Sequence, residues 1–199
     1  MRKRAAGDEG PCGKQINDSA GTIHPEWLDA SLTPVPKKGS LTKPEMWRTI
    51  GVMDILSTIT TTAGARRIQK FSEKNMPDLQ NGFRAKRGAA DALWNVHRAL
   101  RLRRAANLTT WAASCDMRAA FDSISRKALF EIMLKLGFAP HMVNILRRLH
   151  RNTRLVFKMG GKKYTVWNRA GVRTGDPAGP DLFLLCMLAI FEKVEWPPG

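Results

Sequence analysis

The segment around Asp116 most constrains what this chain can fold into. Residues 109–115 form an apolar run that leads directly into Asp116. An aromatic residue, Phe121, follows five positions later, and a second acid, Asp122, comes directly after it. A short apolar run between polar stretches is typical of a buried strand. We therefore predict a strand over 109–115 that ends in an acid, with Asp122 capping the structure that follows.

A second unusual segment lies about fifty residues further along the chain. It reads Gly171-Val172-Arg173-Thr174-Gly175-Asp176-Pro177 and opens into an apolar run over 182–190. That run of nine residues is about half the length that a membrane-spanning helix needs. We therefore expect a loop followed by a core helix, and no membrane span.

The composition favours a nucleic-acid partner. Lys and Arg number 33 against 17 Asp and Glu, which gives a formal net charge of +16 and a sequence pI near 10.5. Such a surplus attracts polyanions and speeds association with them at low salt. A merely soluble basic protein, or part of a larger chain with acidic regions elsewhere, is the alternative interpretation.

The cysteines and the N-terminus indicate an intracellular chain, in the nucleus or the cytoplasm. The three cysteines lie far apart and form no metal-binding pair, so we expect reduced thiols. The first residues are basic and polar and have no apolar stretch of the kind that a signal peptide needs. The oligomeric state stays open.

The patterns along the chain predict an α+β fold with an antiparallel sheet. Residues 1–24 lack periodicity and are predicted to form a disordered tail, and 32–36 are predicted to be extended before a turn at 37–40. A threonine run at 58–62 weakens any helix prediction there.

Later segments carry clearer signals. A hairpin is predicted around Gly160 and Gly161, between residues 154–157 and 164–167. Four helices are predicted: one after Gly88, one capped by Ser123 or Ser125 and ended by Gly137, one from Pro140, and one over 181–193.

In their order and spacing, the two unusual segments resemble the first two palm motifs of reverse transcriptases of the non-LTR (LINE-like) retroelement type. Residues 32–39 and 47–50 look like two fingers strands of this family, and 80–88 look like its Gln-x-Gly-Phe-Arg-x-x-Arg segment. The resemblance implies the fingers and partial palm of a right-hand polymerase, with the thumb absent. It divides the chain into the tail 1–24, a fingers-like region 25–108 and a partial palm 109–199.

The resemblance also implies roles for individual residues. Asp116 would be the catalytic acid and would bind Mg²⁺ or Mn²⁺ in a two-metal mechanism. Phe121 would exclude a ribose 2′-hydroxyl, and Thr174 stands where the family usually carries glutamine. The implied nucleotide-binding residues are Lys37, Lys38, Arg48, Ala119, Ala120, Phe121, Thr174 and Gly175. The implied nucleic-acid-binding residues are Arg84, Lys86 and Arg87.

The resulting hypothesis is an RNA-directed DNA polymerase domain that takes an RNA template, a DNA primer and deoxynucleotide triphosphates. The family's second catalytic signature, an aromatic-x-Asp-Asp turn, does not occur before Gly199. We therefore expect this chain alone to extend no primer, whether Gly199 is a true terminus or a truncation. The alternative is a non-catalytic, basic remnant that binds nucleic acid.

Overall fold

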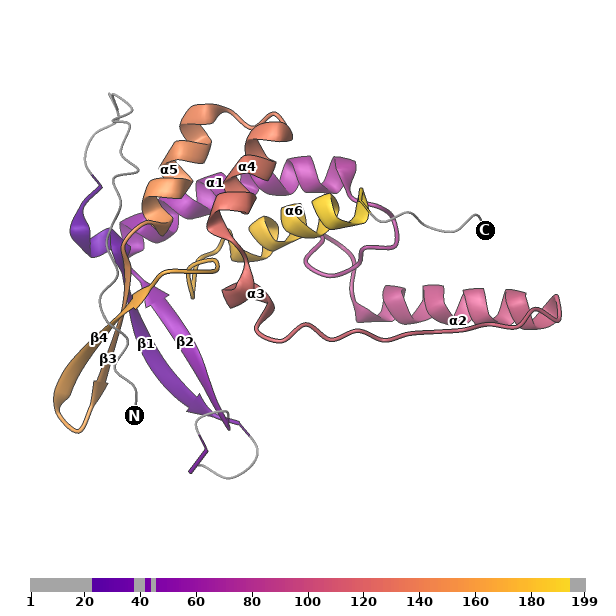
Figure 1. Ribbon diagram of the computed structural model, residues 1–199, viewed down its shortest axis with the longest axis horizontal. Coiled ribbons are helices and arrows are strands. Elements are labelled where there is room, and N and C mark those ends of the chain that lie inside the picture. The colour runs from indigo at the N-terminus through magenta and orange to yellow at the C-terminus, as the bar shows by residue number, and fades with distance from the viewer. Residues whose placement is uncertain (1–22, 38–41, 44–45, 194–199) are drawn as a thin grey trace, which may run out of the picture.

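Helices form the core of the computed structural model, which describes residues 23–37, 42–43 and 46–193 (Figure 1). In chain order the elements are η1 (Pro25–Leu28), β1 (Asp29–Pro36), β2 (Trp47–Met53), α1 (Ile55–Asn75), α2 (Ala89–Ala105), α3 (Ala120–Ser123), α4 (Arg126–Lys135), α5 (Pro140–His150), β3 (Thr153–Met159), β4 (Lys162–Asn168) and α6 (Gly179–Phe191). Within the described residues, none of these helices combines the length and apolar character needed to cross a membrane.

The main core lies among α1, α4, α5 and α6. Buried side chains from all four helices form it, among them Ile68, Leu129, Leu146 and Leu182. The helix predicted from Pro140 is confirmed as α5, and its Val143, Leu146 and Leu149 are buried. Each such side chain contributes about 1.5–3 kcal/mol through burial. The helical layer is therefore the rigid base on which the strands and loops are held.

Helix α1 corrects the expectation for the threonine run. The run lies inside a helix of 21 residues, where Thr58, Thr60, Thr61 and Thr62 each donate a hydroxyl hydrogen bond to a carbonyl four residues earlier. Asp54 caps the helix by accepting the N–H groups of the second and third helical residues. Packing of one face against the core then outweighs the weak helix propensity of threonine.

The sheet confirms the α+β class but is mixed rather than wholly antiparallel. Its strand order is β2-β1-β3-β4, and the β1–β2 and β3–β4 pairs are antiparallel. Strands β1 and β3 run parallel over only three residue pairs, beginning at Asp29 and Arg154. The Arg154 guanidinium donates two hydrogen bonds to the Asp29 carboxylate there, at 2.6 and 2.9 Å. Both strands leave the helical layer in the same direction, and the two hairpins spread apart beyond the joint (Figure 1).

The strand predicted over 109–115 is wrong in this structure. These residues form an exposed loop that returns from the end of α2 toward α3, and Trp111 is 92% exposed (Figure 1). Arg103 of α2 holds the loop, donating to the Thr109 carbonyl and to the Thr110 hydroxyl, both at 3.0 Å. A strand needs a neighbouring strand for its backbone hydrogen bonds, and no described strand lies beside this segment.

Helix α2 begins as predicted, after Gly88, but its apolar face is not covered. The Asp91 carboxylate accepts the Gly88 N–H at 2.7 Å and so fixes the first turn. Leu93, Val96 and Leu100 share one face and are all exposed, and the structure buries no residue of this helix against the described part of the chain. The helix therefore extends away from the core (Figure 1).

The remaining sequence predictions have mixed outcomes. Ser125 caps α4 as expected, Gly137 ends it with a positive φ of 85°, and the predicted hairpin is present as β3 and β4. The predicted tail over 1–24, apart from its last two residues, and most of the turn at 37–40 lie outside the described residues, as does Lys38.

Candidate functional site

A pocket of about 340 Å³ lies where β2, α3 and the loop before α6 meet. It is lined by Thr49, Phe121, Asp122, Val172, Arg173, Thr174, Gly175, Asp176, Gly179 and Pro180. The pocket thus unites the two segments that the sequence singled out, although they lie about fifty residues apart.

Two glycines allow the backbone segments around the pocket to approach closely. Gly171 has a φ of 70°, and a Cβ there would lie 2.5 Å from the Asp122 Cα and 2.6 Å from the Phe121 carbonyl oxygen. Gly175 has a φ of 85°, and a Cβ there would overlap the carbonyl of Gly51 in β2. Since only glycine tolerates both the contact and the positive φ, these positions hold the loop against α3 and β2. Sequence analysis missed the part played by Gly51, for which no motif gave a signal.

Phe121 is held in a fixed position beside the pocket. Its ring centroid lies 5.1 Å from that of Phe183 and 5.8 Å from that of Phe83. Its backbone carbonyl accepts the Val172 N–H at 3.0 Å. Aromatic contacts on two sides and a backbone bond to the neighbouring loop leave this half-buried ring little freedom to move.

A buried arginine anchors the loop that forms the pocket floor. The Arg173 guanidinium donates to the Trp27 carbonyl at 2.6 Å and to the Ser57 hydroxyl at 3.1 Å. Burial lowers its pKa, and the nearby Asp176 carboxylate opposes that shift. Burial in turn raises the pKa of Asp176, against the stabilising effects of the Ala178 N–H, Arg173 and Thr61. No pattern in the sequence indicated this structural role of Arg173.

Asp116 lies outside the pocket lining. Its carboxylate is exposed, in the loop that precedes α3. Three residues later, Ala119 is in the left-handed conformation, with φ 50° and ψ 46°. Ala120 lines a separate apolar groove between α4 and α6. Among the described residues, no three His, Cys, Asp or Glu side chains come together as a metal site. The donors present therefore do not by themselves fit a divalent cation.

Lys37 and Arg48 lie on the side of the β1–β2 ribbon away from the pocket. Thr49 lines the pocket and Gly51 approaches Thr174, so the odd-numbered positions of β2 face it. Successive strand residues point to opposite faces, which places Arg48 on the other face. Lys37 continues the ladder by donating its N–H to the Met46 carbonyl at 2.7 Å, and so shares the side of Arg48.

The three cations predicted to contact nucleic acid have different environments. Arg84 is buried, since its side chain is only 4% exposed and is bonded to Glu73 and to the carbonyls of Pro77 and Gln80. In this structure it holds the loop before α2 together, and its contact with nucleic acid stays a prediction. Arg87 pairs with Asp78 at 2.8 Å near the surface, and Lys86 is exposed with a positive φ of 59°.

Comparison with solved structures defines the class of fold. The chain is similar to a structure of apo telomerase from Candida tropicalis, with a TM-score of 0.54 and 12% sequence identity, over 84% of this chain and 40% of that one. At this identity the likeness concerns the fold alone. A family model described as "Reverse transcriptase (RNA-dependent DNA polymerase)" matches residues 35–196, which is most of the chain. The chain therefore belongs to the reverse transcriptase family.

The curated relatives narrow this family to retroelements. The chain is 26% identical over 187 residues to the Pol polyprotein of a type-1 R2 retrotransposable element of Popillia japonica. It is 27% identical over 154 residues to the corresponding polyprotein of the type-2 element R2DM of Drosophila melanogaster. These matches cover 93% and 77% of this chain, but only 26% and 14% of the relatives. The similarity supports a reverse transcriptase domain of a non-LTR retroelement Pol, as the sequence motifs predicted.

Proposed function

We propose that the chain supplies the fingers (25–108) and partial palm (109–199) of a retroelement reverse transcriptase, and that its 340 Å³ pocket receives a deoxynucleotide. One observation carries this proposal: Phe121, Thr174 and Gly175, which two separate motifs assign to nucleotide binding, line the same pocket. The reaction would be RNA-directed DNA synthesis from a primer, with an RNA template.

The fixed ring of Phe121 is suited to selecting the sugar. A ring that cannot move aside leaves no space for a 2′-hydroxyl, so a deoxynucleotide fits better than a ribonucleotide. The Thr174 hydroxyl can donate or accept one hydrogen bond to the bound nucleotide. Gly175 lets the loop that carries Thr174 lie directly against β2, because the absent Cβ leaves room for the Gly51 carbonyl.

Reverse transcriptases as a family use divalent metal ions, and Asp116 is the acid assigned to bind them, with Mg²⁺ or Mn²⁺ as the ion. The described residues place no second or third ligand beside Asp116. Metal binding at Asp116 therefore needs donors from another segment or another chain, and the role of the pocket is limited to binding and orienting the nucleotide.

Nucleotide titrations followed by NMR of the ¹⁵N-labelled chain test the pocket. We expect dATP to shift the amide signals of Phe121, Thr174 and Gly175, and ATP to bind more weakly because it carries the 2′-hydroxyl. The substitution Phe121→Val should bring the two affinities closer together. Phe157→Val, which removes a ring from the β3–β4 hairpin, serves as the matched control. Shifts that spread over other surfaces, or a dATP preference that Phe121→Val leaves unchanged, would contradict the proposal.

The second candidate is a basic binding remnant without polymerase activity, which the lack of a three-ligand metal group among the described residues favours. Primer extension with Mg²⁺ separates the two candidates. Templated synthesis that Asp116→Asn abolishes supports the polymerase. Binding of template and primer without extension supports the remnant.

A further inference from the structure

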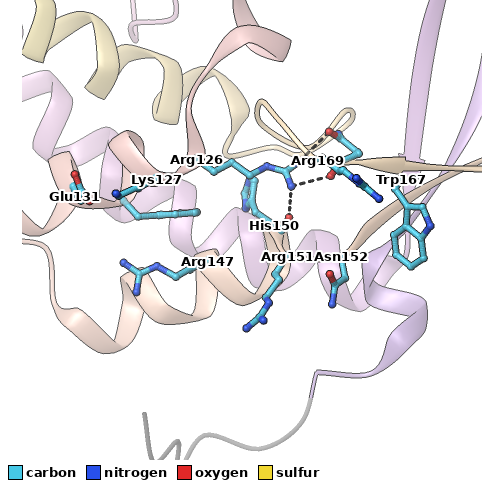
Figure 2. Close-up of a pocket in the computed structure, with 11 residues that line it drawn as sticks. Arg126, Lys127, Glu131, Arg147, His150, Arg151, Asn152, Trp167 and Arg169 are labelled. Carbon is cyan, nitrogen blue, oxygen red and sulfur yellow. Dashed lines mark hydrogen bonds between the residues drawn. The ribbon is translucent and has the colours of Figure 1, made fainter. Parts of the chain in front are cut away.

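A cavity of about 750 Å³ lies at the base of the β3–β4 hairpin, between α4 and the end of α5 (Figure 2). It shares no lining residue with the nucleotide pocket. No motif in the sequence pointed to it, because its residues come from three elements and none lies in the segments that resemble polymerase motifs.

The cavity is strongly cationic. Five cations line it, against one carboxylate, Glu131: Arg126, Lys127, Arg147, Arg151 and Arg169. Lys127, Arg151 and Arg169 are exposed, and Arg147 is half-buried with its guanidinium 5.6 Å from the centre of the Phe130 ring. Such an excess of positive charge in a concave surface attracts anions.

The fifth cation of the lining, Arg126, gives the cavity rigid walls. Arg126 donates from Nε to the Gly171 carbonyl at 2.6 Å. It also donates from Nη1 to the Asn168 and His150 carbonyls and from Nη2 to the Asn168 side chain (Figure 2). These bonds tie the start of α4 to the end of α5 and to the end of β4. Burial lowers the pKa of His150 to about 3, so this ring adds no charge near neutral pH. The exposed cations therefore stand on a fixed frame.

An exposed aromatic ring continues the cationic surface along the hairpin. Trp167 lines the cavity and is 53% exposed. Alternation along β4 places Lys163 on the same face as Trp167, and Lys158 of β3 lies opposite Lys163 in the register. From Lys163 to Arg169 the strand spans roughly 20 Å, at about 3.3 Å per residue. A single phosphate needs far less surface, whereas a polymer of phosphates and bases can use all of it.

We propose that this cavity and the adjoining face of the β3–β4 hairpin bind single-stranded nucleic acid, with phosphates on Arg147, Arg151 and Arg169 and a base stacked on Trp167. Grooves of this kind combine cations that follow the backbone with aromatic rings on which bases stack. The surface lies apart from the nucleotide pocket, so it holds a strand away from the reacting end. An acidic peptide would use the cations but not the exposed indole, and a duplex would not offer an unpaired base for it.

Fluorescence anisotropy with a labelled, unstructured RNA of about 16 nucleotides, a length within single-strand site sizes, tests the proposal. The double substitution Arg147→Ala/Arg151→Ala should weaken binding and make the plot of log K against log salt shallower by about 1.4, since each lost phosphate contact on a single strand contributes about 0.7. The matched control is Arg66→Ala/Lys70→Ala, two exposed cations with the same spacing on α1. It should leave both affinity and slope near the wild-type values.

Trp167 gives an independent test. Trp167→Ala should weaken binding about fivefold or more without changing the salt slope, and Trp167→Phe should restore most of the affinity, because a base stacks on either ring. Circular dichroism of each variant checks that the fold is retained. The readout involves no nucleotide triphosphate, so a failure of the nucleotide-pocket proposal would leave it unaffected.

Other probes identify the ligand and define the results that would overturn the proposal. DNA of the same sequence should bind the same surface, and the ratio of the two affinities tells which strand is preferred. Equal effects of the double substitution and its control would overturn the proposal. So would displacement of the RNA by inorganic phosphate at matched ionic strength, or tighter binding of a duplex that Trp167→Ala leaves unchanged.

Discussion

At the scale of single residues, the arginines that lie in the interior of this chain serve the fold more than the chemistry. Arg84 and Arg173 are buried and Arg126 is half-buried, and all three donate to backbone carbonyls. Arg126 and Arg173 connect segments that are distant in the sequence, and Arg84 stabilises the loop before α2. Arg84 shows what a sequence motif leaves open: the motif indicates that an arginine is needed, whereas the structure shows that its partners here are Glu73 and backbone carbonyls.

His150 should make the chain sensitive to acid. Its folded-state pKa of about 3 lies below the ordinary 6.5, first because of burial and then because of the nearby Arg173 and Arg126, against a raising effect of the bond to Leu146. Below pH 6.5 the unfolded chain takes up a proton that the folded chain refuses, so stability falls as the pH drops from 6.5 toward 3. The contribution is on the order of 1 kcal/mol per pH unit.

Urea unfolding of wild type and His150→Gln at several pH values measures this effect. The stability of the wild type minus that of the variant should fall on acidification, since glutamine does not titrate. Wild type and variant must be compared at each pH because Asp181 acts in the opposite direction. Burial and the nearby Glu73 raise the pKa of Asp181 to about 6, so its contribution to the stability of the folded chain is lost as the pH rises from 4 to 6. A difference that stays constant from pH 7 to pH 4 would contradict the assignment to His150.

At the scale of elements, the sequence predicted best where the signal was local. Helices α4 and α5 and the β3–β4 hairpin follow from periodicity, caps and the Gly160-Gly161 turn. The predicted strand over 109–115 failed because pairing is not local, and an apolar run becomes a strand only beside another strand. The grouping of Phe121 and Thr174 in one pocket could be anticipated from the family motifs, but the approach of Gly51 to Gly175 could not.

Two substitutions in helix α1 separate the effect of its N-terminal cap on stability from the effect of threonine helix propensity. Asp54→Ala removes the acceptor for the N–H groups of Leu56 and Ser57 and should cost about 1 kcal/mol. Thr60→Ala should stabilise the chain by a few tenths of a kcal/mol, roughly the difference in helix propensity, because its hydroxyl bonds only to a carbonyl in an exposed turn. Thermal unfolding should therefore show a lower Tm for Asp54→Ala and a slightly higher Tm for Thr60→Ala than for the wild type. Equal losses in both would show that the threonine side chain is needed in its own right.

At the scale of the whole molecule, the two proposed binding surfaces lie around one helical core. The loop 171–178 reaches α3 and β2 on the side of the nucleotide pocket, while Arg126 binds the carbonyl at the start of the same loop from the side of the basic cavity. Both surfaces therefore depend on this one loop. The long helix α2 and the returning loop stand apart from this arrangement and leave apolar side chains exposed (Figure 1).

The response to Mg²⁺ follows from the same distribution of residues. A ligand that binds only the folded state raises the free energy of unfolding by RT ln(1 + [L]/Kd). A single exposed carboxylate binds a cation weakly, so millimolar concentrations of the cation have almost no effect on stability. Asp116 is such a carboxylate, with no group of three metal ligands among the described residues. We expect MgCl₂ to change the Tm of this chain no more than NaCl of equal ionic strength, to within about 1 °C. A saturable rise specific to Mg²⁺ that Asp116→Asn removes would instead mean that the chain completes a metal site by itself. In that case the exposed loop that carries Asp116 would have to fold onto further acids when the ion binds.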